Sequence, residues 1–262
     1  MTRHVALVTG ASLGLGEQLA TLFARNGHDV VLVARNEARL EALVERLRVH
    51  QVTAHIILAD LAEPSAPQKL FAAVNAKGLE IEFLVNNAGF GSNGAFLDLP
   101  LQGEADMLEV NCAAVLKLSH LFGGPMRERG HGRILNIAST AGFQPGPFMA
   151  TYYATKAFVL SFSQALAHEL KPHGVFVTCY CPGATATGFG ARSGNEKSLL
   201  FRRGSGVAKA DDVAADAYES LMQGDVLSVH GALNWVMAQS VRFSPRSWVT
   251  AIAANLNSRP AE

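Results

Sequence analysis

The chain has 262 residues, 49% of them hydrophobic and 17% charged, so it can bury a large core and is expected to form one domain over residues 1–262. Its 22 basic and 22 acidic side chains cancel, which excludes a global attraction to nucleic acid or to an anionic membrane. No stretch reaches the roughly 18 consecutive apolar residues of a membrane span, and the N-terminus does not resemble a signal peptide. We therefore expect a cytoplasmic protein with no nucleic-acid partner, and membrane association is disfavoured.

Short apolar runs alternate along the chain with segments of helical periodicity. Strands are predicted at 4–9, 29–34, 53–59, 82–86, 133–138, 174–181 and 226–230. Helices are predicted at 14–26, 36–50, 65–77, 103–128, 150–172 and 210–222. Continuous apolar strands that alternate with helices predict an α/β fold, a doubly wound, parallel seven-stranded sheet with helices on both faces.

Two segments stand apart from this alternation. Residues 188–209 are rich in glycine and cations with one acid, Glu196, and we interpret them as an active-site lid, with an ordinary surface loop as the alternative. Residues 232–258 predict a helical C-terminal tail of two short amphipathic helices, with Ser244 as an N-cap and Pro245 as the first residue of the second helix. The tail is expected to pack on the lid or on a second subunit. Binding to a membrane surface is the disfavoured alternative, because the polar faces of the tail carry few cations.

The three cysteines predict no metal site. Cys112, Cys179 and Cys181 are interpreted as buried thiols in a reducing compartment. Cys179 and Cys181 are expected on opposite faces of the strand at 174–181.

A glycine-rich turn links the first strand to the first helix. Gly10, Gly14 and Gly16 allow a tight turn and a close approach of backbone to a phosphate, which the helix N-terminus attracts. The spacing is a variant of the dinucleotide fingerprint, and a plain strand-to-helix turn would also use glycine. No carboxylate follows the second strand, where Arg35 offers a fork suited to a 2′-phosphate, so NADP(H) is preferred and NAD(H) is possible. Ser12 is a candidate second phosphate contact.

Two further strand ends carry polar or small residues. Asp60 follows the third strand and is expected to accept a hydrogen bond from an adenine amino group or to cap the next helix. Asn87, Ala88 and Gly89 follow the fourth strand, and their small size lets a cofactor lie against the backbone, although a simple turn has the same composition.

Tyr152 and Lys156 form the candidate reaction centre. In a helix they lie one turn apart on one face, so the ammonium is expected to lower a phenol pKa that is ordinarily about 10. Ser139 precedes them and adds a hydroxyl donor. The spacing by itself also describes an ordinary amphipathic pair.

Over residues 3–187 the motifs together resemble the short-chain dehydrogenase/reductase family. The residues that carry the resemblance are Thr-Gly-x-x-x-Gly-x-Gly at 9–16, Asn-Asn-Ala-Gly at 86–89, Asn111, Ser139, Tyr152-x-x-x-Lys156 and Pro182-Gly183 with Thr187. The resemblance implies a Rossmann-like fold and a catalytic tetrad of Asn111, Ser139, Tyr152 and Lys156. It also implies a homodimer or homotetramer, although the tail departs from the family pattern and puts the usual C-terminal contacts in doubt.

The resemblance gives each residue of the tetrad a role. Tyr152 is the implied general acid or base, Ser139 polarises the substrate oxygen, Lys156 binds the nicotinamide ribose, and Asn111 holds a water in the proton path. The predicted cofactor contacts are Gly10, Ser12, Leu13, Gly14, Leu15, Gly16, Arg35, Asp60, Leu61, Asn87, Ala88, Gly89, Tyr152, Lys156, Pro182, Gly183, Thr185 and Thr187.

These features predict an oxidoreductase that exchanges hydride between NADP(H) and a carbonyl or secondary alcohol. An apolar wall is expected from Phe90, Phe96, Phe143, Pro145, Pro147, Phe148 and Met149, which favours a hydrophobic ketone. A 3-oxoacyl thioester whose carrier phosphate meets the basic lid is one alternative. A non-catalytic NADP-sensing protein is another, and a sugar-nucleotide epimerase is disfavoured because little chain remains for a substrate domain.

Overall fold

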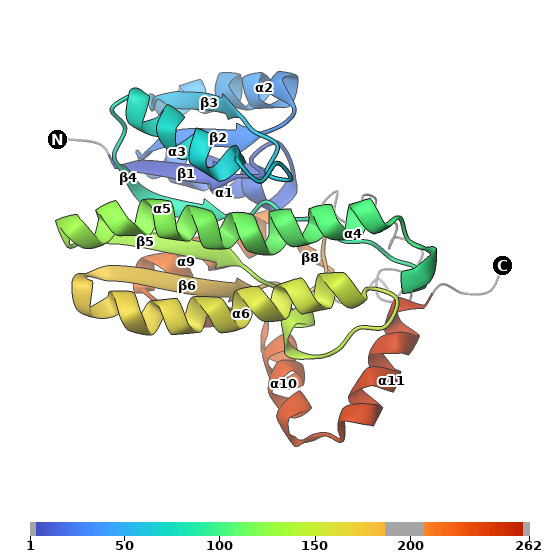
Figure 1. The fold of residues 1–262 in the computed structure, drawn as a ribbon. Helices are drawn as coiled ribbons and strands as arrows, with labels where there is room; N and C mark the ends of the chain where they lie inside the picture. Colours follow the sequence, from blue (N-terminus) through green and yellow to red (C-terminus); the bar gives the residue numbers. More distant parts are fainter. Residues whose placement is uncertain (1–3, 187–206, 259–262) are drawn as a thin grey trace.

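Seven parallel strands form one sheet, in the order β3-β2-β1-β4-β5-β6-β9 (Figure 1). The computed structural model describes residues 4–186 and 207–258. The strands are β1 (Val5–Thr9), β2 (Asp29–Ala34), β3 (Ala54–Leu58), β4 (Ile81–Asn86), β5 (Gly132–Ile137), β6 (Val175–Cys181) and β9 (Leu227–Val229). Every pairing in the sheet is parallel. The predicted α/β fold with its seven-stranded sheet is therefore confirmed.

Helices cover both faces of the sheet. On one face α1 (Gly14–Arg25), α2 (Glu37–Leu47) and α9 (Ala210–Gln223) pack against alternate strand residues such as Ala6 and Val8. On the other face α3 (Ala66–Ala76), α5 (Ala114–Arg129) and α6 (Ala150–Leu170) pack against the intervening residues, such as Val5 and Leu7. Because successive strand residues point to opposite faces, burial on both sides explains the uninterrupted apolar strands.

Apart from small shifts of boundaries, the structure differs from the predicted elements in two places. The helix expected at 103–128 is α4 (Leu101–Leu108) and α5, joined by a π-helical turn at Glu109–Ala113. A short parallel pair, β7 (Thr185–Ala186) and β8 (Ala208–Lys209), was not predicted. Its second strand belongs to the proposed lid, of which 188–206 lie outside the described residues.

Cys179 and Cys181 lie on the same face of β6, so the prediction of opposite faces is wrong. Their sulfur atoms are 4.0 Å apart, and both side chains belong to one buried cluster. The reason is the two-residue period of a strand, which turns only the intervening Tyr180 to the other face. All three cysteines are free thiols, but only Cys179 and Cys181 are buried, so the prediction of burial is wrong for the partly exposed Cys112. The described ranges contain no cluster of side chains able to hold a metal ion.

The C-terminal tail forms a helical hairpin that extends from the body beside α6 (Figure 1). It consists of α10 (Ala232–Ser240), a 3₁₀ turn (Val241–Phe243) and α11 (Arg246–Asn257). The second helix begins one residue later than predicted, because Pro245 is its N-cap and the Ser244 hydroxyl donates to the carbonyl of Ser240 instead. Among residues 4–186 and 207–258, no helix combines the length and apolar character needed to cross a membrane.

A buried asparagine anchors the end of the hairpin to the body. The Asn257 side chain accepts a hydrogen bond from the Tyr153 hydroxyl at 3.2 Å and donates to the Pro147 carbonyl at 3.1 Å. Its backbone carbonyl accepts from the Asn93 side chain at 2.9 Å. Asn257 is fully buried, so these bonds connect α11 to α6 and to two loops with no competition from water.

Replacing Asn257 should therefore loosen α11. In Asn257→Ala the Tyr153 hydroxyl and the Pro147 carbonyl lose their partner, and we expect the free energy of unfolding to fall by about 2 kcal/mol. Hydrogen exchange should accelerate in residues 246–257 more than in the sheet. The control is Asn255→Ala on the exposed side of the same helix, for which a change within about 0.5 kcal/mol is expected. Equal exchange rates in the two variants would contradict the anchoring role.

Candidate active site

One large cavity opens at the carboxyl ends of the strands. Its volume is about 1010 Å³, and it extends from the glycine turn after β1 to the inner faces of α10 and α11. The predicted site residues that line it are Gly10, Ser12, Leu13, Gly14, Leu15, Arg35, Asp60, Leu61, Asn87, Ala88, Gly89, Ser139, Tyr152, Lys156, Pro182, Gly183 and Thr185. Gly16 and Asn111 are not part of the lining, and Thr187 lies outside the described residues.

The glycine turn presents backbone to this cavity. Gly10 and Gly14 have φ angles of 68° and 56°, which favour glycine, and α1 begins at Gly14. Gly16 is needed for packing, because a Cβ there would lie 2.4 Å from both the Gly10 carbonyl oxygen and Asn87 Nδ2. The N-cap residue of α1, Leu13, makes no side-chain hydrogen bond to the first turn, whose N–H groups and partial positive charge can attract an anion.

Arg35 and Asp60 face each other across the ends of β2 and β3. The Arg35 guanidinium donates to Asp60 over 3.4 Å, and its side chain is 65% exposed. Asp60 also accepts from the backbone N–H of Ala62, while α3 begins after Ser65, so the alternative that Asp60 caps this helix is wrong. Arg39, in the first turn of α2, lines the same end of the cavity and was missed by the sequence reasoning.

Ser139, Tyr152 and Lys156 meet at the centre of the cavity. Ser139 follows β5, and its hydroxyl accepts from the N–H of Ala141 at 3.1 Å. Tyr152 and Lys156 lie in the first two turns of α6, and all three side chains are at least nine-tenths buried. Lys156 Nζ donates to the Ile137 carbonyl at 2.8 Å and lies 5.7 Å from the centre of the Tyr152 ring.

Burial controls the titration of these groups. It raises the pKa of Tyr152 above its ordinary value, against the opposing effect of a hydrogen bond with Ser139. It lowers the pKa of Lys156 from 10.5 to about 8. The prediction that the Lys156 charge depresses the Tyr152 pKa is wrong in this structure, because loss of hydration is the largest effect on both groups.

Asn111 lies behind the cavity, in the π-helical turn. Its side-chain amide donates to the carbonyl of Phe90 at 2.9 Å and to the Thr155 hydroxyl at 3.0 Å, and its oxygen accepts from the Phe90 N–H at 3.1 Å. Both amide hydrogens are thus used within the protein. A Cβ on Gly89 would lie 3.1 Å from the Asn111 oxygen and 3.7 Å from Lys156 Nζ, so the three residues do come together.

The apolar wall comes mainly from the tail. Of the residues predicted for it, only Phe90 and Met149 line the cavity, whereas Phe143 packs in a separate buried cluster and Phe96 and Phe148 are exposed. The apolar lining that sequence reasoning missed is Leu233, Met237, Val241, Trp248, Val249, Ile252 and Leu256. Their helical spacing was visible, but nothing local showed which surface they cover.

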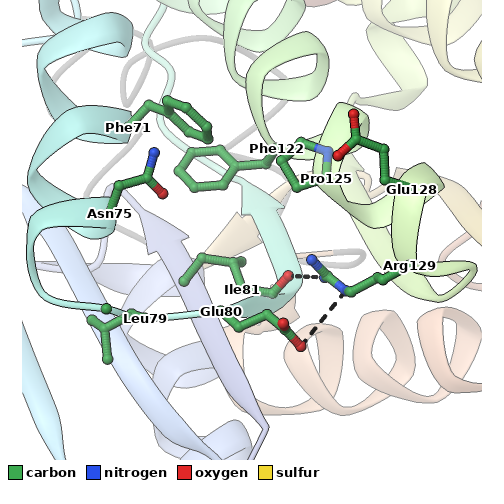
Figure 2. Close-up of a pocket in the computed structure, with 10 residues that line it drawn as sticks. Phe71, Asn75, Leu79, Glu80, Ile81, Phe122, Pro125, Glu128 and Arg129 are labelled. Atoms are coloured by element: carbon green, nitrogen blue, oxygen red, sulfur yellow. Dashed lines mark hydrogen bonds and ion pairs between the residues drawn. The ribbon is translucent and has the colours of Figure 1, made fainter.

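A second hollow of about 490 Å³ lies between α3 and α5 (Figure 2). It is lined by Leu79, Glu80 and Ile81 at the start of β4, whereas the large cavity meets the residues that follow this strand. The Arg129 guanidinium at its edge donates to the Ile81 carbonyl and lies 3.8 Å from Glu80. This hollow is therefore at the opposite edge of the sheet from Tyr152.

Comparison with known proteins agrees with this geometry. Residues 4–198 match the family model described as short chain dehydrogenase. The chain is 37% identical over 180 residues to a very-long-chain 3-oxoacyl-CoA reductase of Pyrenophora tritici-repentis, an alignment that covers 66% of this chain and 52% of the relative. The chain thus spans about half the length of that curated relative.

Solved structures match nearly the whole chain. The short-chain dehydrogenase of Sphingobium yanoikuyae in complex with NADPH is 34% identical, with a TM-score of 0.81 and coverage of 92% of this chain and 94% of that one. The bulky-bulky ketone specific alcohol dehydrogenase of Comamonas testosteroni is 32% identical, with a TM-score of 0.79 and coverage of 93% of both chains. With the matched family model, these findings make the chain a member of the short-chain dehydrogenase/reductase family of oxidoreductases.

Proposed function

We propose that the protein is an NADP(H)-dependent carbonyl reductase that converts a bulky hydrophobic ketone into a secondary alcohol. One observation carries the proposal: Ser139, Tyr152 and Lys156 line the same cavity as the glycine turn and Arg35. A proton donor and an anion-binding turn therefore share one enclosed space.

The residues around the turn fit a dinucleotide with a 2′-phosphate. The N-terminus of α1 can hold a pyrophosphate, and Gly10 and Gly14, which line the cavity, place no side chain in its way. Arg35 and Arg39 at the end of β2 suit the 2′-phosphate, and the related Sphingobium yanoikuyae structure contains NADPH. When bound, NADPH supplies the hydride that reduces the carbonyl carbon.

The side chains at the centre of the cavity complete the reduction at the carbonyl oxygen. Tyr152 donates its phenolic proton to this oxygen as negative charge develops there, and the Ser139 hydroxyl donates a second hydrogen bond. Because burial raises the pKa of Tyr152, the phenol is protonated at neutral pH, which suits a proton donor in the direction of reduction. The Lys156 ammonium then stabilises the phenolate that remains.

The shape of the cavity supports a bulky apolar substrate. Beyond Tyr152, side chains of α10 and α11 such as Met237, Ile252 and Leu256 form its wall. The related Comamonas testosteroni enzyme is named for bulky ketones, and the Pyrenophora tritici-repentis relative for 3-oxoacyl-CoA. A 3-oxoacyl thioester is therefore the second candidate, since it also combines a ketone with an apolar chain.

Replacing Tyr152 by Phe tests the assignment directly. The variant keeps the ring but loses the proton donor, so we expect NADPH-dependent ketone reduction to fall by about 10²–10⁴-fold. The measurement is NADPH oxidation with a series of ketones from small to bulky and with a 3-oxoacyl thioester. Tyr218→Phe, on α9, removes the hydroxyl of a residue that does not line the cavity, and it serves as the matched control. Near-normal turnover of the Tyr152 variant would overturn the proposed role, and a wild-type preference for the thioester would favour the second candidate.

The preference for NADPH should depend on Arg35. We expect Arg35→Ala to raise the KM for NADPH by about tenfold, since one charge-assisted contact with phosphate is lost, and to leave the KM for NADH nearly unchanged. Steady-state kinetics with each cofactor measures the ratio of the KM for NADPH to the KM for NADH. Arg25→Ala, at the end of α1, controls for a general loss of positive charge. An equal effect on both cofactors would exclude a contact with the 2′-phosphate.

The affinity for NADPH should fall at alkaline pH. Lys156 is a cation below its pKa of about 8 and loses its charge as the pH rises through that value. If the ammonium binds the ribose hydroxyls, the Kd for NADPH will be lowest below pH 8 and will rise above it. Fluorescence titration between neutral and alkaline pH measures this change. Lys156→Met should flatten the profile near pH 8, and an unchanged profile would show that another group is responsible.

A further inference from the structure

The outer side of the α10–α11 hairpin exposes large apolar side chains. Phe243, in the turn between the helices, is 89% exposed, and Trp235 and Val236 on α10 are 53% and 55% exposed. None of the three lines the active-site cavity, so a bound substrate would not cover them. The turn lies at the end of the hairpin that is farthest from the sheet (Figure 1).

The charge of the hairpin differs from that of the whole chain. No aspartate or glutamate occurs between residues 226 and 258, although the chain has as many acids as bases. Arg242 and Arg246 lie on either side of Phe243, in the turn and at the start of α11. Aromatic side chains flanked by arginine, without acids, match a surface that presents phosphate groups above an apolar layer.

A second copy of the chain fits this surface poorly. A symmetric dimer formed through the hairpin would bring Arg242 and Arg246 of both copies together, because such an interface pairs a patch with itself. The hairpin contains no carboxylate to compensate their charge. Anionic lipid headgroups would compensate it, with a contribution of about fivefold in affinity for each arginine.

We propose that the end of the hairpin, residues 235–246, docks on the surface of an anionic lipid bilayer. Phe243 and Trp235 enter the boundary between headgroups and acyl chains, and the two arginines bind lipid phosphates. The hairpin lies on the bilayer without crossing it. The sequence disfavoured membrane binding because the tail carries few cations. The proposal departs from that expectation because Phe243, Trp235 and Val236 are exposed and do not line the cavity.

Tryptophan fluorescence provides a local test. The chain has two tryptophans, Trp235 and Trp248, and both belong to the hairpin. The full-length protein is titrated with vesicles of phosphatidylcholine alone and of phosphatidylcholine mixed with phosphatidylglycerol, and binding is also measured by co-sedimentation. We expect a blue shift of the emission and co-sedimentation with the anionic vesicles, and weaker binding to the neutral ones.

Single substitutions at exposed positions separate the apolar contribution to vesicle binding from the electrostatic one. Phe243→Asp should weaken binding to anionic vesicles by at least about tenfold, because it removes an apolar contact and adds a negative charge. Arg242→Glu should weaken binding to anionic vesicles more than binding to neutral ones. Val49→Asp, at a 75% exposed site in the 3₁₀ turn Arg48–His50, is the matched control and should bind as the wild type does.

Two results would overturn the proposal. The first is that neither vesicle composition shifts the emission or sediments the protein. The second is that light scattering shows an oligomer that Phe243→Asp dissociates while vesicles have no effect, which would make this face a contact between copies of the chain.

Discussion

A hydrogen-bonded clasp between the ends of β1 and β4 holds the cofactor side of the cavity in place. The Thr9 hydroxyl donates to the Val85 carbonyl at 3.1 Å and accepts from the N–H groups of Asn87 and Ala88, each at 3.0 Å. The Asn87 side chain returns a bond to the Thr9 carbonyl at 2.9 Å. The order of the strands along the chain reverses between β1 and β4. In open parallel sheets, ligands bind in the crevice at this topological switch point. The clasp therefore fixes the crevice where the glycine turn begins.

Buried polar contacts extend from this clasp to α6, the helix that carries Tyr152 and Lys156. Next to Asn87, the Asn86 side chain donates to Asn136 on β5 at 2.8 Å, and Asn136 donates to the Ser163 hydroxyl on α6 at 2.9 Å. Asn86, Asn136 and Ser163 are almost completely buried, so an unmade bond would cost more than the roughly 1 kcal/mol that each contributes. The bond between Asn136 and Ser163 thus fixes the position of α6, which carries Tyr152 and Lys156, along β5, which leads to Ser139. Hydrogen bonds select one position of the helix on the strand, whereas apolar packing alone would tolerate small shifts between them.

Most of the sheet, and the glycine turn, could be predicted from sequence because their signals are local. An apolar run such as 30–33 identifies a strand buried on both faces, and the glycines of the turn lie next to the strand and the helix that they join. The wall of the cavity could not be predicted, because it depends on contacts between distant segments. Asn257 meets Tyr153 across 104 positions of sequence, and no periodicity within the tail indicates that partner. Phe143 and Phe148 were assigned to the wall by proximity to Tyr152 along the chain, yet the fold turns one into another cluster and the other to solvent.

The pKa values of Tyr152 and Lys156 also could not be predicted from the sequence. Helical spacing brings the two side chains to one face, and from this spacing the ammonium was expected to lower the phenol pKa. Spacing contains no information about hydration, however, and both groups are almost fully buried. Burial favours the neutral form of each, which raises the pKa of the phenol and lowers that of the amine. The Lys156 ammonium donates to the Ile137 carbonyl at 2.8 Å, and the buried Tyr152 is a neutral phenol at neutral pH. In the reduction that we propose, such a pair suits proton donation, because the phenolate forms only when a substrate oxygen takes the proton. The Lys156 ammonium, 5.7 Å from the centre of the Tyr152 ring, would then stabilise it.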